Sequence, residues 1–236
     1  DLVISIGSRL DTKATGSPPS SFARGARKIV VDVDPSELVK FEHFGVRLDL
    51  PIVADAREFL DEANRGSRGL NLSSRFMPWL DKIHSWKKTY PACVTSYYEQ
   101  EDINPYVFVK ELSKQTPGNA MVFTDTGCAV AWMLQAFEVR EGQRLFHDFN
   151  NTAMGWALPA SIGASFSDSS VPVICVIGDG SLQMSINELA TVVRHGLPIK
   201  IFLINNHGYS MIRQTQDQWM SSEYIASSFE GGLALP

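Results

Sequence analysis

Short apolar runs rich in β-branched residues alternate with longer amphipathic stretches through the second half of the chain. Most of these runs are followed by Gly, Asp or Asn, which is typical of strands that end in turns. The predicted strands span residues 121–124, 144–146, 173–177 and 199–204. The predicted helices between them span residues 129–137, 156–166 and 185–195. Alternating units of this kind predict an α/β fold, in which a parallel sheet carries helices on both faces.

Residues 1–65 carry a shorter version of the same pattern. Residues 2–6 and 28–33 predict two strands, each followed by polar turn residues. Residues 35–41 and 54–64 predict helices, and a proline opens the first of them, where proline is favoured. We interpret residues 1–65 as the C-terminal part of a Rossmann-like domain.

A connecting region, residues 66–102, separates the two patterns. It opens with the Gly- and Ser-rich run GSRGLNLSSRF, which predicts a linker, and continues with a predicted helix at 79–89. The second domain, residues 103–236, then begins with Asn104 as the N-cap of a helix and Pro105 at its first position.

The bulk composition excludes several classes of protein. Of 236 residues, 44% are hydrophobic and 20% are charged, which describes an ordinary globular chain with a sizeable core. The net charge of −5 argues against a nucleic-acid or anionic-membrane partner, and no apolar run is long enough to span a membrane. Cys93, Cys128 and Cys175 have neither disulfide-framework nor metal-site spacing, which predicts a reducing, cytoplasmic location.

Polar residues follow two of the predicted strands in an unusual pattern. Gly178-Asp179-Gly180-Ser181 follows one strand, and Asn205-Asn206 follows the next. The carboxyl ends of parallel strands share one edge of a sheet, where open α/β sheets bind ligands. Asp179 and Asn206 can therefore offer two hard oxygens to one cation, while glycine leaves the backbone open to a phosphate. The plain alternative is a solvated turn in which Asp179 caps a helix.

The run GDGSLQMSINELATVVRHGLPIKIFLINN, residues 178–206, resembles the thiamin-diphosphate (ThDP) motif, which opens with Gly-Asp-Gly and ends in Asn-Asn. Three further segments, MGWALPA, DLVISIGSRLDTKATG and KIVVDVDPSEL, are similar to segments of the acetolactate synthase family. The resemblance implies the ThDP-binding fold preceded by part of a Rossmann-like middle domain. Because both ends of the sequence look cut, we expect a fragment of a longer protein.

The resemblance also implies a set of magnesium and diphosphate contacts. Asp179, Asn206 and the carbonyl of Gly208 correspond to the metal ligands. The implied diphosphate contacts are Gly178, Gly180, Ser181, Thr126, Gly127, Cys128 and Ala129. Family members often carry Gln-His where this chain has Cys128-Ala129, and a plain helix start is the alternative for that loop.

Four further residues correspond to family positions around the rest of the cofactor. Met154 is the catalytic candidate, because a bulky apolar side chain there props the cofactor in its bent, reactive form. The carbonyl of Thr152 would accept a hydrogen bond from the aminopyrimidine. Tyr209 would line the diphosphate end through its backbone, and Met211 would lie near cofactor or substrate. An ordinary core methionine is the alternative for Met154.

The implied activity is the decarboxylation or carboligation of a 2-oxo acid of the pyruvate type, with ThDP and Mg²⁺ as cofactors. The family's proton relay needs a Glu on an N-terminal pyrimidine-binding domain of a neighbouring subunit, and no part of this chain resembles that domain. We therefore expect a homodimer or homotetramer in the complete protein, with the isolated chain inactive. Thr215 stands where acetolactate synthases commonly carry a Trp that shapes the acceptor pocket, and this difference argues against a role in branched-chain amino-acid synthesis. The run NNHGYSMIRQTQ is more similar to ThDP enzymes encoded in surface-polysaccharide gene clusters.

Two other hypotheses about the function stay open. The chain could belong to a non-catalytic protein with the ThDP-binding fold, or to an NAD-linked dehydrogenase. The glycine-rich motif of NAD-binding proteins needs a third glycine, and this chain has Gln183 at that position. Unless a metal ion were bound, the Asp179 carboxylate would also repel the pyrophosphate of NAD. FAD is a further cofactor that the resemblance implies for the opening domain. The residues concerned are Gly7, Arg9, Asp32 and Asp34, and the alternative is a purely structural domain.

Overall fold

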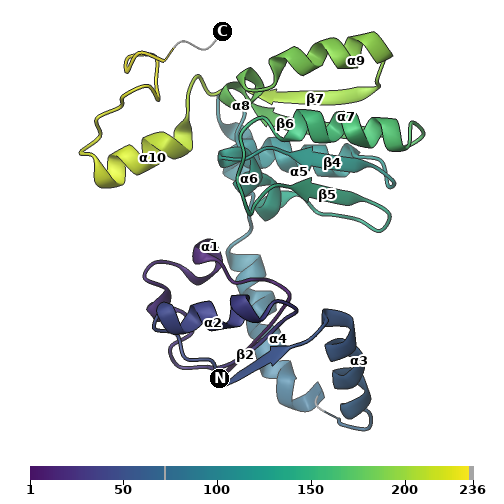
Figure 1. Ribbon diagram of the computed structural model, residues 1–236, viewed down its shortest axis with the longest axis vertical. Coiled ribbons are helices and arrows are strands. Elements are labelled where there is room, and N and C mark those ends of the chain that lie inside the picture. The colour runs from purple at the N-terminus through teal and green to yellow at the C-terminus, as the bar shows by residue number, and fades with distance from the viewer. Residues whose placement is uncertain (72, 234–236) are drawn as a thin grey trace. The chain divides into compact units, whose positions relative to one another are not determined.

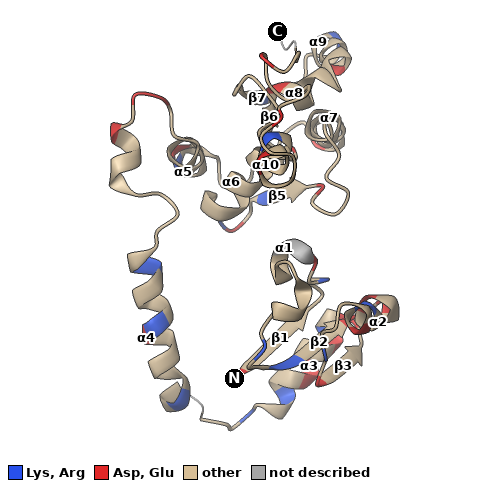
Figure 2. Ribbon diagram, turned by 90° about the vertical axis from the view of Figure 1, so that its left-hand side faces the viewer, with Lys and Arg blue, Asp and Glu red and all other residues tan. Residues whose placement is uncertain are grey.

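The computed structural model describes residues 1–71 and 73–233, and it divides into two compact units, Asp1–His84 and Ser85–Pro236. The first unit (Figure 1) contains a parallel three-stranded sheet of order β1-β2-β3, whose strands Figure 2 labels. Its strands are β1 (Leu2–Ile6), β2 (Arg27–Asp32) and β3 (Leu50–Val53), and its helices are α1 (Thr12–Thr15), η1 (Pro19–Ser21), α2 (Pro35–His43) and α3 (Ala56–Gly66). Helix α4 (Ser73–Thr89) runs across the boundary between the units.

The core of the first unit lies where α2 packs on the sheet. Leu38 and Phe41 of α2 are buried together with Val30 of β2 and Val46. The sequence did not predict β3, because it is only four residues long and contains Pro51, which cannot donate to a strand ladder. Helix α4 begins at Ser73 instead of at residue 79. The serines that predicted a linker stand at the start of a helix, a position that serine favours.

The second unit contains a four-stranded parallel sheet of order β5-β4-β6-β7 (Figure 1). The strands are β4 (Met121–Thr124), β5 (Arg144–His147), β6 (Val173–Gly178) and β7 (Ile199–Ile204). The helices are η2 (Thr95–Glu99), α5 (Pro105–Gln115), α6 (Cys128–Ala136), α7 (Ala157–Ser167), α8 (Asp179–Gln183), η3 (Ile186–Glu188), α9 (Leu189–His195) and α10 (Ser210–Trp219). The predicted α/β fold with a parallel sheet is confirmed.

Two hydrophobic cores cover the two faces of this sheet. Ile174 and Val176 of β6 face the core that α5 and α6 form, whereas Val173, Cys175 and Ile177 face the core that α7 and α9 form. This alternation is the two-residue period of a strand that is buried on both sides. Neither α6 nor α7 carries a charged side chain, as Figure 2 shows.

Local signals placed several boundaries correctly and missed others. Asn104 caps α5 by accepting a hydrogen bond from the N–H of Tyr106, and Gly196 ends α9 in the left-handed conformation. The predicted helix 185–195 is wrong in its first turns, because Ser185 leaves helical geometry (φ −136°) and separates α8 from η3 and α9. Helix α10 was not predicted. Among the described residues, no helix is long and apolar enough to cross a membrane.

Cys175 gives this fold a pH dependence that can be measured. Burial raises the pKa of its thiol to about 12, whereas an unfolded thiol titrates near 8.5. The thiol's contribution to stability is therefore complete below about pH 8.5, and the free energy of unfolding falls by about 1.4 kcal/mol per pH unit above it, toward pH 12.

The variant Cys175→Ala has no such thiol, so its stability should fall less steeply between about pH 8 and about pH 10. Urea unfolding of both proteins at the two pH values measures the slopes. The loss of stability caused by the smaller alanine side chain is the same at both pH values, so it does not affect the difference between them. If the free energy of unfolding fell equally steeply with pH in both proteins, the burial of the thiol would be contradicted.

Candidate functional site

Three strand ends meet at one edge of the second sheet. Thr124 is paired with Val176, and Gly178 is paired with Ile204, so β4, β6 and β7 are in register. The residues that follow these strands are Asp125, Asp179 and Asn205-Asn206. The structure therefore brings the two polar segments of the ThDP-like motif to the same edge, as their positions in a parallel sheet predicted.

The Asp179 carboxylate lies at the centre of this edge and is only 8% exposed. Its Oδ1 accepts a hydrogen bond from the N–H of Gly180 (2.7 Å), and its Oδ2 accepts one from the N–H of Gly208 (3.3 Å). The second bond joins the loop after β6 to the loop after β7. In the part of the chain that the structure describes, no Lys, Arg or His side chain pairs with Asp179. A buried carboxylate without a cationic partner is costly, and a bound cation would remove that cost.

Asn206 and Gly208 supply the other predicted metal ligands. As its amide is oriented, the Asn206 Nδ2–H donates to the Ser210 hydroxyl (2.7 Å), which leaves the amide oxygen as the group that can bind a metal. A Cβ on Gly208 would lie 2.6 Å from the Ser227 carbonyl oxygen, so only glycine fits there. One carboxylate, one amide and one backbone carbonyl form an all-oxygen donor set that suits Mg²⁺.

The described residues contain no cluster of three or more His, Cys, Asp or Glu side chains that could hold a metal. A zinc site built from three or more such side chains therefore has no support in this part of the chain. The mixed oxygen set around Asp179 is the metal site that the chemistry favours.

The glycine turn after β6 is packed against an aromatic ring. Gly178 is extended and precedes α8, and Gly180 and Ser181 are buried at the start of that short helix. A Cβ on Gly180 would lie 2.0 Å from Cε1 of Tyr209, so the Tyr209 ring covers this glycine. We expected Tyr209 to act through its backbone. Its N–H donates to the Ser227 carbonyl (3.1 Å), and its ring is the part that reaches the turn.

The second predicted diphosphate loop, Thr126–Ala129, begins α6. Gly127 stands at the N-cap with φ +73°, and the start of α10 lies beside it, with Met211 Cγ at 3.8 Å from where a Cβ would be. Burial raises the pKa of the Cys128 thiol, which keeps it in the unreactive thiol form. Cys128, the first residue of α6, therefore has a structural role and is not a catalytic nucleophile.

The turn that carries Met154 is fixed from two sides. Met154 is 37% exposed, and the following Gly155 has φ +78°. A Cβ on Gly155 would lie 2.8 Å from Cβ of Met184 and 3.1 Å from the Ser181 carbonyl. On the other side, the Asp125 carboxylate accepts hydrogen bonds from this turn. Thr152, two residues before Met154, also has a positive φ of 53°.

The sequence patterns pointed neither to Asp125 nor to the segment, residues 216–227, that holds the loop after β7. Asp125 was not among the predicted site residues, although an Asp directly after a buried strand is itself a signal. In that segment, Gln216 is 6% exposed, donates to the Ile225 carbonyl (3.0 Å) and accepts from the Ser227 hydroxyl. The Ser227 carbonyl in turn accepts from the N–H of Tyr209 and so supports the loop after β7.

Two family models cover most of the chain. Residues 125–233 match the model described as thiamine pyrophosphate enzyme, C-terminal TPP binding domain, and residues 1–63 match thiamine pyrophosphate enzyme, central domain. The chain belongs to the thiamine pyrophosphate enzyme family. Thiamine pyrophosphate is another name for ThDP, so the match covers all the residues predicted to contact this cofactor.

Relatives of this thiamine pyrophosphate enzyme chain include acetolactate synthase subunits. It is 34% identical to the acetolactate synthase large subunit of Cyanidium caldarium, over 98% of this chain and 39% of that one. It is 32% identical to the large subunit of Lactococcus lactis (98% and 38%) and 29% identical to acetolactate synthase 1, chloroplastic, of Zea mays (93% and 34%). The chain spans between a third and two fifths of the length of these relatives.

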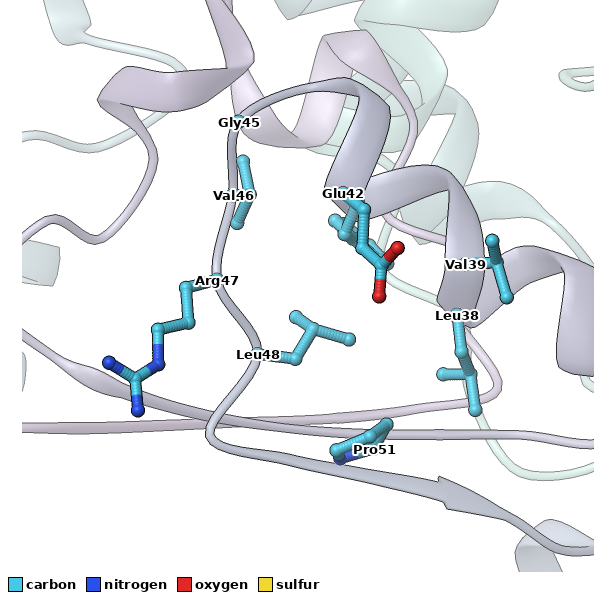
Figure 3. Close-up of a pocket in the computed structure, with 9 residues that line it drawn as sticks. Leu38, Val39, Glu42, Gly45, Val46, Arg47, Leu48 and Pro51 are labelled. Atoms are coloured by element: carbon cyan, nitrogen blue, oxygen red, sulfur yellow. The ribbon is translucent and has the colours of Figure 1, made fainter.

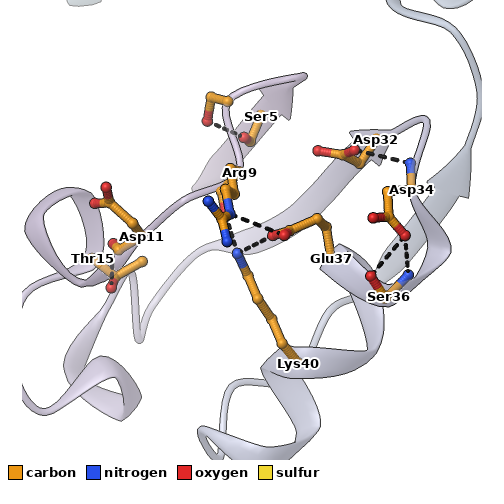
Figure 4. Close-up of polar contacts among 10 residues, drawn as sticks. Ser5, Arg9, Asp11, Thr15, Asp32, Asp34, Ser36, Glu37 and Lys40 are labelled. Atoms are coloured by element: carbon orange, nitrogen blue, oxygen red, sulfur yellow. Dashed lines mark hydrogen bonds and ion pairs between the residues drawn. The ribbon is translucent and has the colours of Figure 1, made fainter. Parts of the chain in front are cut away.

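In the central domain of this thiamine pyrophosphate enzyme chain, polar side chains gather after β1 and β2. Arg9 and Lys40 both pair with Glu37, as Figure 4 shows. Asp34 caps α2, and the hydroxyl and N–H of Ser36 hold the pKa of its carboxyl below the usual value. Asp32 accepts from the N–H of Asp34. Gly7, which has φ +58°, donates its N–H to the Val31 carbonyl. These predicted dinucleotide positions therefore all have local partners.

A cavity of about 450 Å³ lies beside α2 in the same domain and is lined mainly by apolar side chains (Figure 3). Leu38, Leu48 and Pro51 face it, Glu42 points between α2 and the segment after it, and Arg47 points away. It lacks the converging polar groups that fix a ligand.

Proposed function

We propose that this chain supplies the diphosphate and magnesium half of the active site of a ThDP-dependent enzyme that decarboxylates or joins 2-oxo acids. The observation that carries the proposal is the buried Asp179 carboxylate, which has no cationic partner among the described residues and bonds to Gly208 beside Asn206. The match to the TPP binding domain and the acetolactate synthase relatives support it, and they favour a donor of the pyruvate type.

Each part of the edge has a role in this proposal. Asp179, Asn206 and the Gly208 carbonyl would hold Mg²⁺, which neutralises a diphosphate. Gly178, Gly180 and Ser181, with the loop Thr126–Ala129, would surround the diphosphate with N–H and hydroxyl donors. ThDP, when bound, supplies an electron sink for the bond to the departing carboxylate.

The Met154 side chain and the Thr152 carbonyl would orient the rest of the cofactor. Met154 is partly exposed at the edge where the loops meet, and a long, polarizable side chain suits an apolar supporting role. Met211, whose side chain lies beside Gly127, would border the cofactor or the substrate.

The other half of the site would come from parts of the protein beyond this chain. We propose that a pyrimidine-binding domain of a neighbouring subunit supplies the proton-relay Glu, so that the working enzyme is a homodimer or homotetramer. The residues of this chain by themselves would then give no turnover. A cytoplasmic location is part of the proposal and rests on the three free cysteines. Flavin in the central domain also stays a proposal, and visible absorbance of the purified full-length protein tests it.

Calorimetric titration of the complete protein tests the function directly. ThDP should bind in the presence of Mg²⁺ and far more weakly after chelation, and a screen of 2-oxo acids should then identify the donor. Binding of ThDP without turnover of any 2-oxo acid would favour a non-catalytic relative. Stabilisation by a nicotinamide dinucleotide in place of ThDP would overturn the proposal.

A further inference from the structure

We propose that Asp125 is a positioning residue that fixes the Met154 turn, defined as residues 153–157, before the cofactor arrives. The inference rests on the proposed function, because the Met154 turn matters through the cofactor that it would support. Asp125 forms no hydrogen bond with the predicted metal ligands, and it acts through the backbone of the turn.

The geometry links two segments that are distant in sequence. The Asp125 Oδ1 accepts a hydrogen bond from the N–H of Gly155 (3.2 Å), and its Oδ2 accepts one from the N–H of Ala157 (2.8 Å). The backbone N–H of Asp125 donates to the Val176 carbonyl of β6 (2.9 Å). The carboxylate is thus attached to the sheet through its own backbone and holds the turn with both oxygens.

Burial makes this arrangement strong. Asp125 is 1% exposed, and in the described part of the chain no basic side chain pairs with it. A buried carboxylate that accepts two N–H bonds forms charge-assisted hydrogen bonds, which are stronger than those between neutral groups. Ala157 is the first residue of α7, where the N–H has no acceptor within the helix, and a negative charge is favourable there.

The Met154 turn is also packed tightly on the side that faces residues 181–184. Gly155 packs so closely against Met184 and the Ser181 carbonyl that it has no room for a side chain. The Met154 turn is therefore clamped between Asp125, after β4, and residues 181–184, after β6. A site whose supporting residues are fixed in advance loses less free energy when its ligand binds.

The substitution Asp125→Asn removes the charge and leaves one oxygen in place of two, so at least one of the two N–H bonds is lost. The matched control is Asp168→Asn at the other end of α7, where the exposed carboxylate accepts, among the described residues, only from Ser170. Both variants are made in the complete protein, and each is titrated with Mg²⁺-ThDP and with Mg²⁺-pyrophosphate, which lacks the part of the cofactor that Met154 would support.

Asp125→Asn should weaken ThDP binding by about tenfold or more. It should leave pyrophosphate binding within about twofold of the unmodified protein, as expected for an uncoupled site. Equal weakening of both ligands would overturn the inference, because Asp125 would then act on the diphosphate loop or the whole fold. Unchanged binding of both would also overturn it. If the unmodified protein binds neither ligand, the proposed function fails by itself.

Hydrogen exchange of the unmodified, cofactor-free protein provides a second test that needs no variant. The amides of Gly155 and Ala157 should exchange slowly, because Asp125 is their acceptor. Protection at Ala157 reports on Asp125 directly, since no helical carbonyl can accept that N–H. Exchange of both amides as fast as that of the exposed Asn151 would overturn the inference even if the variant failed to fold.

Discussion

The substitution Asp179→Asn is expected to abolish the magnesium-dependent binding of ThDP while the protein stays folded. The carboxylate is the only charged group among the three predicted metal ligands, and a neutral amide is a far weaker ligand for Mg²⁺. Asparagine has nearly the same shape, and it keeps one oxygen to accept from Gly180 or Gly208. The stability of the cofactor-free protein should therefore change by no more than about 1–2 kcal/mol.

Thermal unfolding with and without Mg²⁺-ThDP measures the effect. A ligand at a hundred times its dissociation constant stabilises a folded protein by about 2.7 kcal/mol, and this gain should disappear in Asp179→Asn. Asp168→Asn, which removes an equal charge from the surface of the same unit, should keep the full gain. An equal ligand-induced shift in both variants would refute the assignment of the metal site.

The sequence predicted the parts of the site that depend on strand order. The strands that precede Asp179 and Asn206 form long apolar runs with clear ends, and parallel neighbours in one sheet must bring those ends together. The helix boundaries at Asn104 and Gly196 were predictable because each depends on one residue, an N-cap asparagine in the first case and a left-handed glycine in the second.

The sequence did not predict the contacts that join separate loops. The bond from Gly208 to Asp179, the two bonds to Asp125 and the Tyr209 ring over Gly180 all connect residues more than one element apart. No local pattern encodes such pairs, because they arise when loops of unlike sequence meet at the sheet edge. Helix α10 was missed because it has few hydrophobic residues, namely Met211, Ile212 and Trp219, and polar residues fill the rest of it.

The substitution Gly155→Ala is expected to destabilise the protein by about 2–5 kcal/mol, a large effect for a single methyl group. At φ +78° an alanine pays the left-handed penalty, and its Cβ would lie 2.8 Å from Cβ of Met184. The clash cannot be relieved easily on either side. The hydrogen bond to Asp125 holds the backbone of Gly155, and the Cβ of Met184 can move only if the backbone of Met184 moves with it. Urea unfolding of the complete protein measures the loss.

Gly163→Ala is the matched control, because it adds the same methyl group to α7, a few residues further along the chain. Nothing lies within 4 Å of a Cβ at Gly163, and the position is inside a helix, where alanine is favoured over glycine by about 0.5–1 kcal/mol. The two variants should therefore shift the urea midpoint in opposite directions. An unchanged or raised urea midpoint in Gly155→Ala would mean that the Met154 turn is loose, and the support that Asp125 gives to the site would then have no rigid partner to act against.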